Sequence, residues 1–180
     1  MNRAVFLDRD GVLNDTTVRD GVSYPPAKAA EVRILPGVPE AVEKLRNAGF
    51  LLIVVSNQPD IARGTLSRDD NKAIFFAVAS ALKLQIVRFC PHDNADNCNC
   101  RKPKPGMILQ EARQLDIDLA RSFMVGDRWS DVAAGEAAGC KTILVERSYS
   151  QAERCRPDFT ARDLAEAAEI IVNVSRSERR

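Results

Sequence analysis

Short apolar runs that alternate with longer helix-like stretches restrict the fold of this 180-residue chain more than any other feature. The run at 50–55 is continuous and has the length of a buried strand, whereas 39–48 has the spacing of an amphipathic helix that stops at Gly49. The predicted strands are 3–7, 50–55, 86–89, 122–125 and 142–145, and the predicted helices are 39–48, 67–82, 105–115, 131–138 and 164–171. This alternation predicts an α/β fold with a mainly parallel sheet and helices on both faces.

The length of the chain is typical of one domain, since domains contain roughly 150 residues. We predict a domain over residues 1–174, including a loop at 90–105, and a frayed end at 175–180. Residues 14–36 and 91–105 are polar and rich in turn formers, and we expect them to be irregular.

Charge and hydropathy exclude two classes of protein. The 26 Lys and Arg residues nearly balance the 25 Asp and Glu residues, so the chain lacks the basic surface of a nucleic-acid-binding protein. No run approaches the roughly 20 apolar residues of a membrane-spanning helix, and the run at 4–7 is too short for a signal peptide. We therefore predict a cytoplasmic protein that binds neither nucleic acid nor a membrane.

An Asp-x-Asp pair follows the first predicted strand. Side chains alternate along an extended chain, so Asp8 and Asp10 can face one side, with Arg9 opposite, and Gly11 permits a tight turn. A magnesium ion prefers hard oxygen ligands and would relieve the repulsion between the two carboxylates. One carboxylate can then attack phosphorus while the other moves protons. The alternative is a turn with two solvated acids.

Polar residues also follow the second predicted strand, where Ser56, Asn57 and Gln58 stand. A hydroxyl and two carboxamides can donate hydrogen bonds to phosphate oxygens, so these residues are candidate phosphate ligands. The alternative is a helix cap or a turn.

An acid follows the strand at 122–125 as well. Asp127 would reach the same edge of the sheet as Asp8 and would complete the magnesium site. Asp131 lies in the first turn of the next predicted helix, where it either orients the site or is an ordinary N-terminal helix acid.

Three cysteines and the chain's single histidine lie within eleven residues, as Cys90, His92, Cys98 and Cys100. These four soft ligands predict a closed, structural zinc site. Buried unligated thiols and an iron-sulfur cluster are the alternatives, and the polar neighbours and the histidine disfavour both. Because His92 belongs to this cluster, no histidine remains for a Ser-His-Asp triad.

Two cations follow the cluster directly. A bound zinc ion would fix the loop and the prolines at 103 and 105 would stiffen it, so Arg101 and Lys102 would be held in place. Two fixed cations beside a pair of carboxylates form a phosphate clamp. Taken alone, the segment is also compatible with a basic turn in water.

Together and in chain order, these motifs resemble the haloacid dehalogenase (HAD) superfamily of phosphohydrolases, which have an Asp-x-Asp, a Ser or Thr, a Lys and a final acid at strand ends. The similarity extends over about residues 3–145. The zinc cluster narrows it to small members with a minimal cap, the heptose 1,7-bisphosphate 7-phosphatases and the histidinol-phosphate phosphatases. The segment 61–64 is similar to the heptose enzymes, although Pro59 and Asp60 replace their usual Ser-Gly.

The resemblance implies a HAD-type, Rossmann-like fold and specific roles for the strand-end residues. Asp8 is the implied nucleophile and Asp10 the implied general acid and base. The Asp8 side chain, the Asp10 backbone carbonyl and Asp127 are implied to hold Mg²⁺, while Ser56 and Lys102 hold the phosphoryl group.

The resemblance also implies residues that recognise the rest of the substrate. Arg101 is one, and Arg128, where the heptose family commonly has a lysine, is expected to meet a second phosphate or a sugar hydroxyl. The loop after the first motif is implied to touch the substrate too, with Thr16, Thr17, Val18 and Arg19.

The expected activity is magnesium-dependent removal of the 7-phosphate of a heptose 1,7-bisphosphate through an aspartyl-phosphate, on the route to nucleotide-activated heptose, a lipopolysaccharide precursor. A histidinol-phosphate phosphatase of histidine biosynthesis is the first alternative. A zinc-stabilised binding module without catalysis is the second. A small enzyme with a minimal cap has little spare surface, so we expect a monomer.

Overall fold

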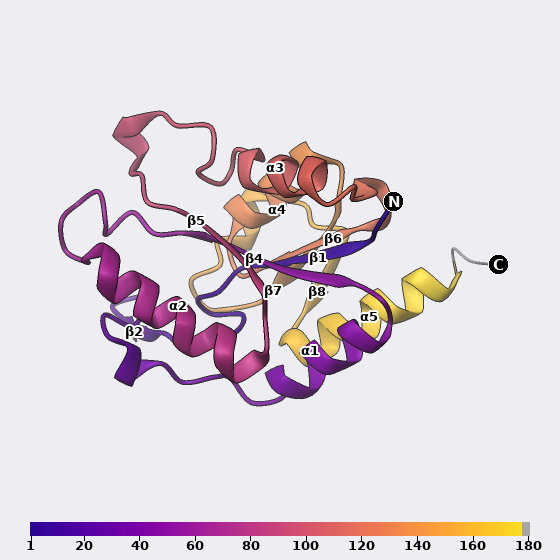
Figure 1. Ribbon diagram of the computed structural model, residues 1–180, viewed down its shortest axis with the longest axis horizontal. Helices are drawn as coiled ribbons and strands as arrows, with labels where there is room; N and C mark the ends of the chain where they lie inside the picture. Colours follow the sequence, from indigo (N-terminus) through magenta and orange to yellow (C-terminus); the bar gives the residue numbers. More distant parts are fainter. Residues whose placement is uncertain (178–180) are drawn as a thin grey trace.

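A parallel sheet of six strands forms the centre of the computed structural model, which describes residues 1–177 (Figure 1). The strands are β1 (Ala4–Leu7), β4 (Leu51–Asn57), β5 (Ile86–Cys90), β6 (Phe123–Gly126), β7 (Lys141–Val145) and β8 (Phe159–Ala161). Their order is β5-β4-β1-β6-β7-β8, with every neighbouring pair parallel. The predicted α/β fold is confirmed.

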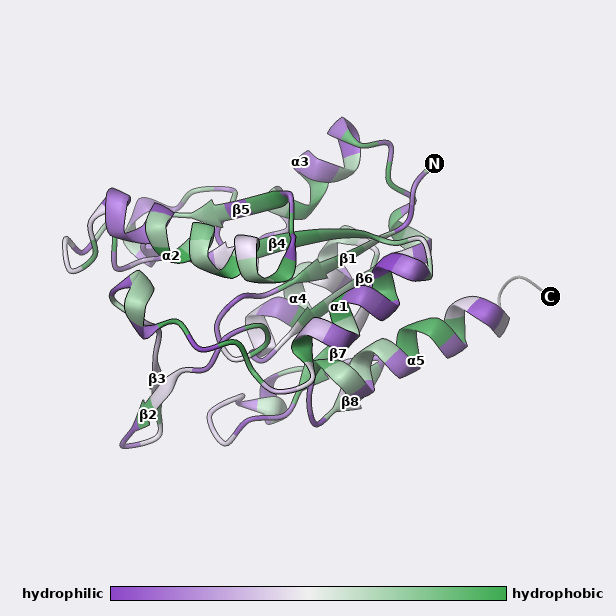
Figure 2. Ribbon diagram, turned by 60° about the horizontal axis from the view of Figure 1, so that its bottom comes forward, coloured by the Kyte–Doolittle hydropathy of each residue, from purple (hydrophilic) through white to green (hydrophobic). Residues whose placement is uncertain are grey.

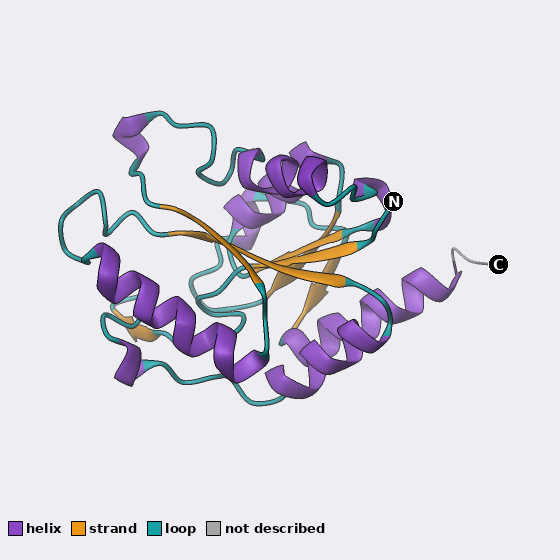
Figure 3. Ribbon diagram, in the orientation of Figure 1, coloured by secondary structure: helices purple, strands orange, loops and turns teal. Residues whose placement is uncertain are grey.

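Helices cover both faces of the sheet (Figures 1 and 3). One face carries α1 (Val38–Asn47), α2 (Arg68–Leu82) and α5 (Leu164–Ser177), and the other carries α3 (Gly106–Gln114) and α4 (Trp129–Ala138). Short 3₁₀ turns lie at Ala29–Glu31, Asn94–Asp96, Leu119–Arg121 and Ala152–Arg154. As the sequence predicts, Ser67 caps α2: its hydroxyl accepts a hydrogen bond from the Asp70 amide at 3.0 Å.

The alternation of side chains along β1 explains why the sheet needs two layers of helices. Val5 and Leu7 belong to the core beneath α1, α2 and α5, whereas Ala4 and Phe6 belong to the core beneath α3 and α4. All four are fully buried, so a strand with both faces apolar is satisfied only between two layers. Figure 2 shows apolar strands at the centre and polar residues on the outer sides of the helices.

The strand order creates the place where a site can form. β1 lies in the middle, the chain adds β4 and β5 on one side of it, and it later adds β6, β7 and β8 on the other. Such a reversal leaves a crevice at the carboxyl ends of the central strands. Asp8 follows β1, Ser56 lies near the end of β4, and Asp127 follows β6.

The structure corrects three expectations. Residues 14–36 are not wholly irregular, because β2 (Thr17–Arg19) and β3 (Val22–Tyr24) form an antiparallel hairpin. A sixth strand of the sheet, β8, was not predicted. The frayed end was wrong for residues 175–177, because α5 continues through Ser177 and Ser175 is buried; residues 178–180 lie outside the described part of the chain.

In the part of the chain that the structure describes, none of the helices has both the length and the apolar character needed to cross a membrane.

Candidate active site

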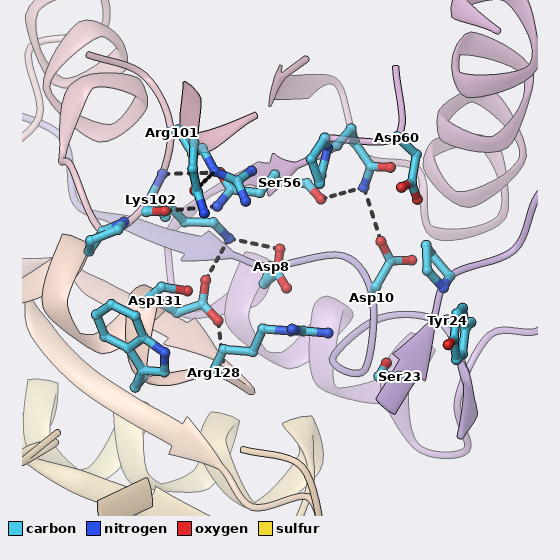
Figure 4. Close-up of a pocket in the computed structure, with 18 of the residues that line it drawn as sticks. Asp8, Asp10, Ser23, Tyr24, Ser56, Asp60, Arg101, Lys102, Arg128 and Asp131 are labelled. Atoms are coloured by element: carbon cyan, nitrogen blue, oxygen red, sulfur yellow. Dashed lines mark hydrogen bonds and ion pairs between the residues drawn. The ribbon is translucent and has the colours of Figure 1, made fainter. Parts of the chain in front are cut away.

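A buried lysine lies between two buried carboxylates at the centre of the site (Figure 4). Lys102 Nζ is 2.8 Å from Asp8 Oδ1 and 2.6 Å from Asp131 Oδ1, and it also donates to the Val55 carbonyl at 2.8 Å. Burial raises the pKa of Asp8 to about 6, even though the Lys102 charge acts in the opposite direction. Near neutral pH Asp8 is therefore ionised, with one oxygen on Lys102.

Asp10 is held in a different way, by donors that favour its charged form. Arg9 donates from Nε and Nη2 to its two oxygens at 3.0 and 2.8 Å, Asn14 donates at 3.0 Å, and Gln58 donates at 3.0 Å. Burial opposes ionisation, but the Arg9 charge and these hydrogen bonds outweigh it and lower the pKa of Asp10. Gln58 also donates to the Ser56 hydroxyl at 2.9 Å, so it links Asp10 to the candidate phosphate ligand.

The turn that follows Asp10 requires a glycine, because it lies against Asp127 and Tyr149. Gly11 has φ +81°, and a Cβ there would lie 2.1 Å from Asp127 Oδ2 and 2.5 Å from the Tyr149 hydroxyl. Both the backbone conformation and the space therefore exclude a side chain. The same construction shows that Asp127 and Tyr149 approach the first motif from one side.

Asp127 completes a group of three buried acids. Carboxylate oxygens of Asp8, Asp127 and Asp131 lie within 4.8 Å of one another. Burial and then the charges of Asp8 and Asp131 raise the pKa of Asp127 well above its usual value, although a hydrogen bond from the Tyr149 hydroxyl acts in the opposite direction. Hard oxygen ligands that repel one another fit a divalent cation such as Mg²⁺.

The backbone around Lys102 is fixed by the end of β4. Asn57 accepts a hydrogen bond from the Lys102 amide at 3.0 Å and donates to the Lys102 carbonyl at 2.9 Å. Because both ends of its carboxamide are used in this way, Asn57 supports the backbone of Lys102, and its role as a direct phosphate ligand stays a prediction.

The four predicted zinc ligands come together. The sulfur atoms of Cys90, Cys98 and Cys100 are 3.1–3.6 Å apart, and His92 Nδ1 is 3.5 Å from Cys90 Sγ and 3.3 Å from Cys100 Sγ. Zinc–sulfur bonds of about 2.3 Å at tetrahedral angles place sulfurs about 3.8 Å apart, close to this spacing. The donor set therefore fits a closed zinc site.

The loop that carries these ligands forms one wall of the site. Arg101 donates to the Asn94 side chain at 2.8 Å and to the His92 carbonyl at 3.2 Å, so the loop holds this guanidinium in place. Arg63, from the segment after β4, pairs with both oxygens of Asp93 at 2.7 and 3.0 Å. Hydrogen bonds from Arg63 lower the pKa of Asp93 to about 2.

Several proteins that are similar to this chain are named as phosphatases. Residues 99–167 match the HAD-hydrolase-like family. The D-glycero-β-D-manno-heptose-1,7-bisphosphate 7-phosphatase of Pasteurella multocida is 34% identical, over 95% of this chain and 97% of that protein. The D-glycero-D-manno-heptose-1,7-bisphosphate 7-phosphatase of Thermosynechococcus vestitus is 36% identical, over 93% and 94%.

A solved structure agrees with these relatives. The crystal structure of D,D-heptose 1,7-bisphosphate phosphatase from B. bronchiseptica, complexed with magnesium and phosphate, matches with a TM-score of 0.84 and 32% identity. The match covers 96% of this chain and 99% of that chain. The chain belongs to this family of HAD-like heptose bisphosphate phosphatases.

In this member of the heptose bisphosphate phosphatase family, a cavity of about 520 Å³ opens above Asp8. Of the predicted site residues it is lined by Asp8, Asp10, Ser56, Asn57, Gln58, Arg101, Lys102, Arg128 and Asp131. Arg101 and Arg128 lie on opposite sides of Asp8 (Figure 4). The residues at the ends of β1 and β4 and the two arginines therefore share one cavity, and Asp127 is buried behind it.

The hairpin contributes to this cavity through its second strand. Residues 22–25 line it, whereas Thr16 and Val18 line a smaller neighbouring cavity, and Thr17 and Arg19 are exposed on β2. The predicted contacts of residues 16–19 with substrate stay predictions.

Sequence reasoning missed several residues of the cavity. Tyr24, Asp60 and Trp129 line it, and Tyr149 lies beside Gly11. Asp60 stood out as a departure from the family pattern, but a lone aromatic residue in a loop has no spacing that would mark it.

Proposed function

We propose that this protein is a magnesium-dependent phosphatase that removes the 7-phosphate of D-glycero-D-manno-heptose 1,7-bisphosphate through an aspartyl-phosphate. The observation that carries the proposal is the arrangement of the Asp8 carboxylate between Lys102 and Asp127 at the floor of a cavity with an arginine on either side. The relatives named as heptose 1,7-bisphosphate 7-phosphatases support the same substrate.

In the first step, an Asp8 oxygen forms a bond to phosphorus and the bond from phosphorus to the sugar oxygen breaks. Lys102 and the Ser56 hydroxyl hold the phosphoryl oxygens. The contacts with Arg9 keep Asp10 ionised in the free enzyme, so a proton must arrive with the substrate. A phosphate monoanion carries one, and Asp10 is placed to pass it to the leaving oxygen.

In the second step, water attacks the phosphorus of the aspartyl-phosphate. Asp10 takes a proton from that water, the new bond from water oxygen to phosphorus forms, and the bond to Asp8 breaks. Inorganic phosphate leaves, Asp8 returns to its carboxylate form, and Asp10 releases its proton to solvent.

The Asp8 side chain, Asp127 and the Asp10 backbone carbonyl would hold the magnesium ion, and Asp131 would orient the site through Lys102. When bound, the ion neutralises the clustered carboxylates and polarises a phosphate oxygen. The magnesium in the related crystal structure supports this assignment.

Zinc is the proposed occupant of the cluster formed by Cys90, His92, Cys98 and Cys100, with a structural role. A closed set of four protein ligands leaves no position for substrate. Its effect on the reaction is the placement of Arg101, which bonds to the same loop.

The two arginines decide between the bisphosphate and the main alternative. A second phosphate would be attracted by Arg101 and Arg128, whereas the cationic amine of histidinol phosphate would be repelled. The proposal predicts a higher kcat/KM for heptose 1,7-bisphosphate than for histidinol phosphate, with both anomers of the heptose compound assayed in the presence of magnesium. A clear preference for histidinol phosphate would overturn it. Monomeric state and cytoplasmic location stay predictions.

A further inference from the structure

The loop between β7 and β8 contributes an aromatic ring to the neighbourhood of the cavity. The guanidinium of Arg128 lies over the ring of Tyr149, with 5.6 Å between the guanidinium carbon and the ring centroid. Arg128 is the N-cap residue of α4, and its backbone amide donates to Asp131 at 3.0 Å. Its backbone is thus fixed by the helix, and its guanidinium reaches toward a loop about twenty residues later in the chain.

Two interactions act on this guanidinium, the contact with the Tyr149 ring and the attraction of the nearby Asp127 charge. In the described part of the chain, the Arg128 guanidinium makes no hydrogen bond or ion pair, so its N–H groups are available to a ligand. Arg101, on the other side of Asp8, already uses Nε and Nη1 on Asn94 and His92. A guanidinium in contact with an aromatic ring keeps N–H groups that can donate to two oxygens of a phosphate.

The Tyr149 ring is itself held against the first motif. The Arg147 side chain donates twice to the Gly11 carbonyl, at 3.1 and 2.9 Å. The Tyr149 hydroxyl is 3.4 Å from Thr16 Oγ1, and the Ser150 carbonyl accepts from the Trp129 amide at 3.3 Å. These contacts hold both ends of the short segment 147–150 against the first motif and α4.

We propose that Tyr149 is a positioning residue for substrate specificity, because its ring holds the guanidinium of Arg128 in the orientation that receives the substrate's second phosphate. This inference rests on the proposed function and deepens it. It assigns discrimination between a bisphosphate and a monophosphate to an arginine–aromatic pair. A lysine at position 128 would not gain this orientation, because an ammonium group has no flat face and no fixed fork of donors.

The test measures kcat/KM for heptose 1,7-bisphosphate and for heptose 7-phosphate, which lacks the second phosphate. Tyr149→Leu removes the ring and should lower the ratio of the two values about two- to fivefold, mainly through KM for the bisphosphate. Tyr149→Phe keeps the ring and removes the hydroxyl, so it should preserve the ratio. Partial unfolding would reduce both kcat/KM values equally, and the ratio is therefore insensitive to it.

A double-mutant cycle completes the test. In an Arg128→Ala background, Tyr149→Leu should cause no further change in the ratio, because the group that the ring positions is gone. A wild-type enzyme that does not favour the bisphosphate would contradict the proposed function itself. A wild-type preference that survives Tyr149→Leu but is lost in Arg128→Ala would overturn the positioning role alone. So would a loss of the ratio in Tyr149→Phe as large as in Tyr149→Leu.

Discussion

Two regions of the site are stabilised in different ways: the carboxylate centre, formed by Asp8, Asp127 and Asp131, and the wall, formed by the zinc-ligand loop at residues 91–104. Asp8, Asp127 and Asp131 are 6%, 1% and 1% exposed, and each follows or approaches the end of a central strand. The zinc-ligand loop, residues 91–104, is mostly exposed or half-buried and contains one short 3₁₀ turn. The sheet holds the three carboxylates, while the Cys/His cluster and ion pairs hold the zinc-ligand loop.

This difference assigns stability and specificity to different parts of the molecule. The apolar clusters that pack on the sheet run directly beneath the carboxylates, so the reacting groups share the stability of the core. The wall has no such core, and the positions of its arginines depend on local interactions such as the ion pair between Arg63 and Asp93. Changes at the centre should therefore affect the chemical step, and changes in the wall should affect recognition.

Replacing the nucleophile should have the largest effect. Asp8→Asn should lower kcat by roughly 10⁴-fold or more, because a carboxamide cannot form the aspartyl-phosphate, and the fold should remain because Lys102 keeps its pair with Asp131. Rapid-quench detection of phosphoenzyme, with steady-state turnover, checks this. Asp69→Asn makes the same change at an exposed residue of α2 and should leave turnover unchanged. Full activity in Asp8→Asn would contradict a nucleophilic role for Asp8 and favour the alternative of a zinc-stabilised binding module without catalysis.

Removing the central cation should be the next largest change. Lys102→Met should lower kcat about 10²- to 10³-fold, because the charge is most useful as phosphoryl charge develops. It also leaves Asp8 and Asp131 buried without their partner, which should destabilise the metal-free protein by about 3–5 kcal/mol. Turnover and urea unfolding in EDTA measure the two effects. If Lys102→Met alters KM and leaves kcat unaltered, Lys102 acts in substrate recognition and not in the chemical step.

The division between centre and wall also describes what the sequence could predict. Asp8, Ser56 and Asp127 were found because an apolar run shows where a strand ends, and parallel strands bring their ends together. The cluster of Cys90, His92, Cys98 and Cys100 could be predicted because the spacing of its residues is local. Each of these signals lies within about a dozen residues.

Contacts between distant segments carry no such signal. Arg9 was placed opposite the acids by alternation alone, yet its guanidinium is buried and clamps Asp10. The pairing of Lys102 with Asp8 joins residues 94 positions apart, and Tyr149 meets Arg128 only through the arrangement of the loop after β7. The hairpin and β8 were missed because strands of three residues are too short to show a period.

Removing a cysteine of the wall should have a smaller effect on catalysis than removing a charged residue of the centre. Cys98→Ser should lower zinc content and the melting temperature, and should raise KM for the bisphosphate about tenfold, the equivalent of one lost charge-assisted contact from Arg101. Turnover of p-nitrophenyl phosphate should change less. Cys155→Ser, outside the cluster, is the matched control. If the zinc-free protein keeps its melting temperature and its KM for the bisphosphate, the loop does not need zinc for its structure.

The smallest predicted effect sharpens the description of the centre as a strained group of acids. Asp8 binds its proton more tightly in the folded protein, with a pKa of about 6, than at its usual value of 3.8. Between these values the folded state holds more protons than the unfolded state, so its stability falls as pH rises. From pH 5 to pH 7 the contribution of Asp8 amounts to a loss of about 1.3 kcal/mol.

Urea unfolding at pH 5 and pH 7 in EDTA, for the wild type and Asp8→Asn, measures this contribution together with the effect of the Asp8 charge on the pKa of Asp127. The wild type should lose more stability than the variant over this range. Added Mg²⁺ favours the ionised carboxylates and should reverse the wild-type trend, since the ion binds more tightly as the acids lose their protons. If the free energy of unfolding depends equally on pH in the two proteins, the pKa of Asp8 is not raised in the free enzyme. The carboxylates would then not be held under mutual repulsion before the cation binds.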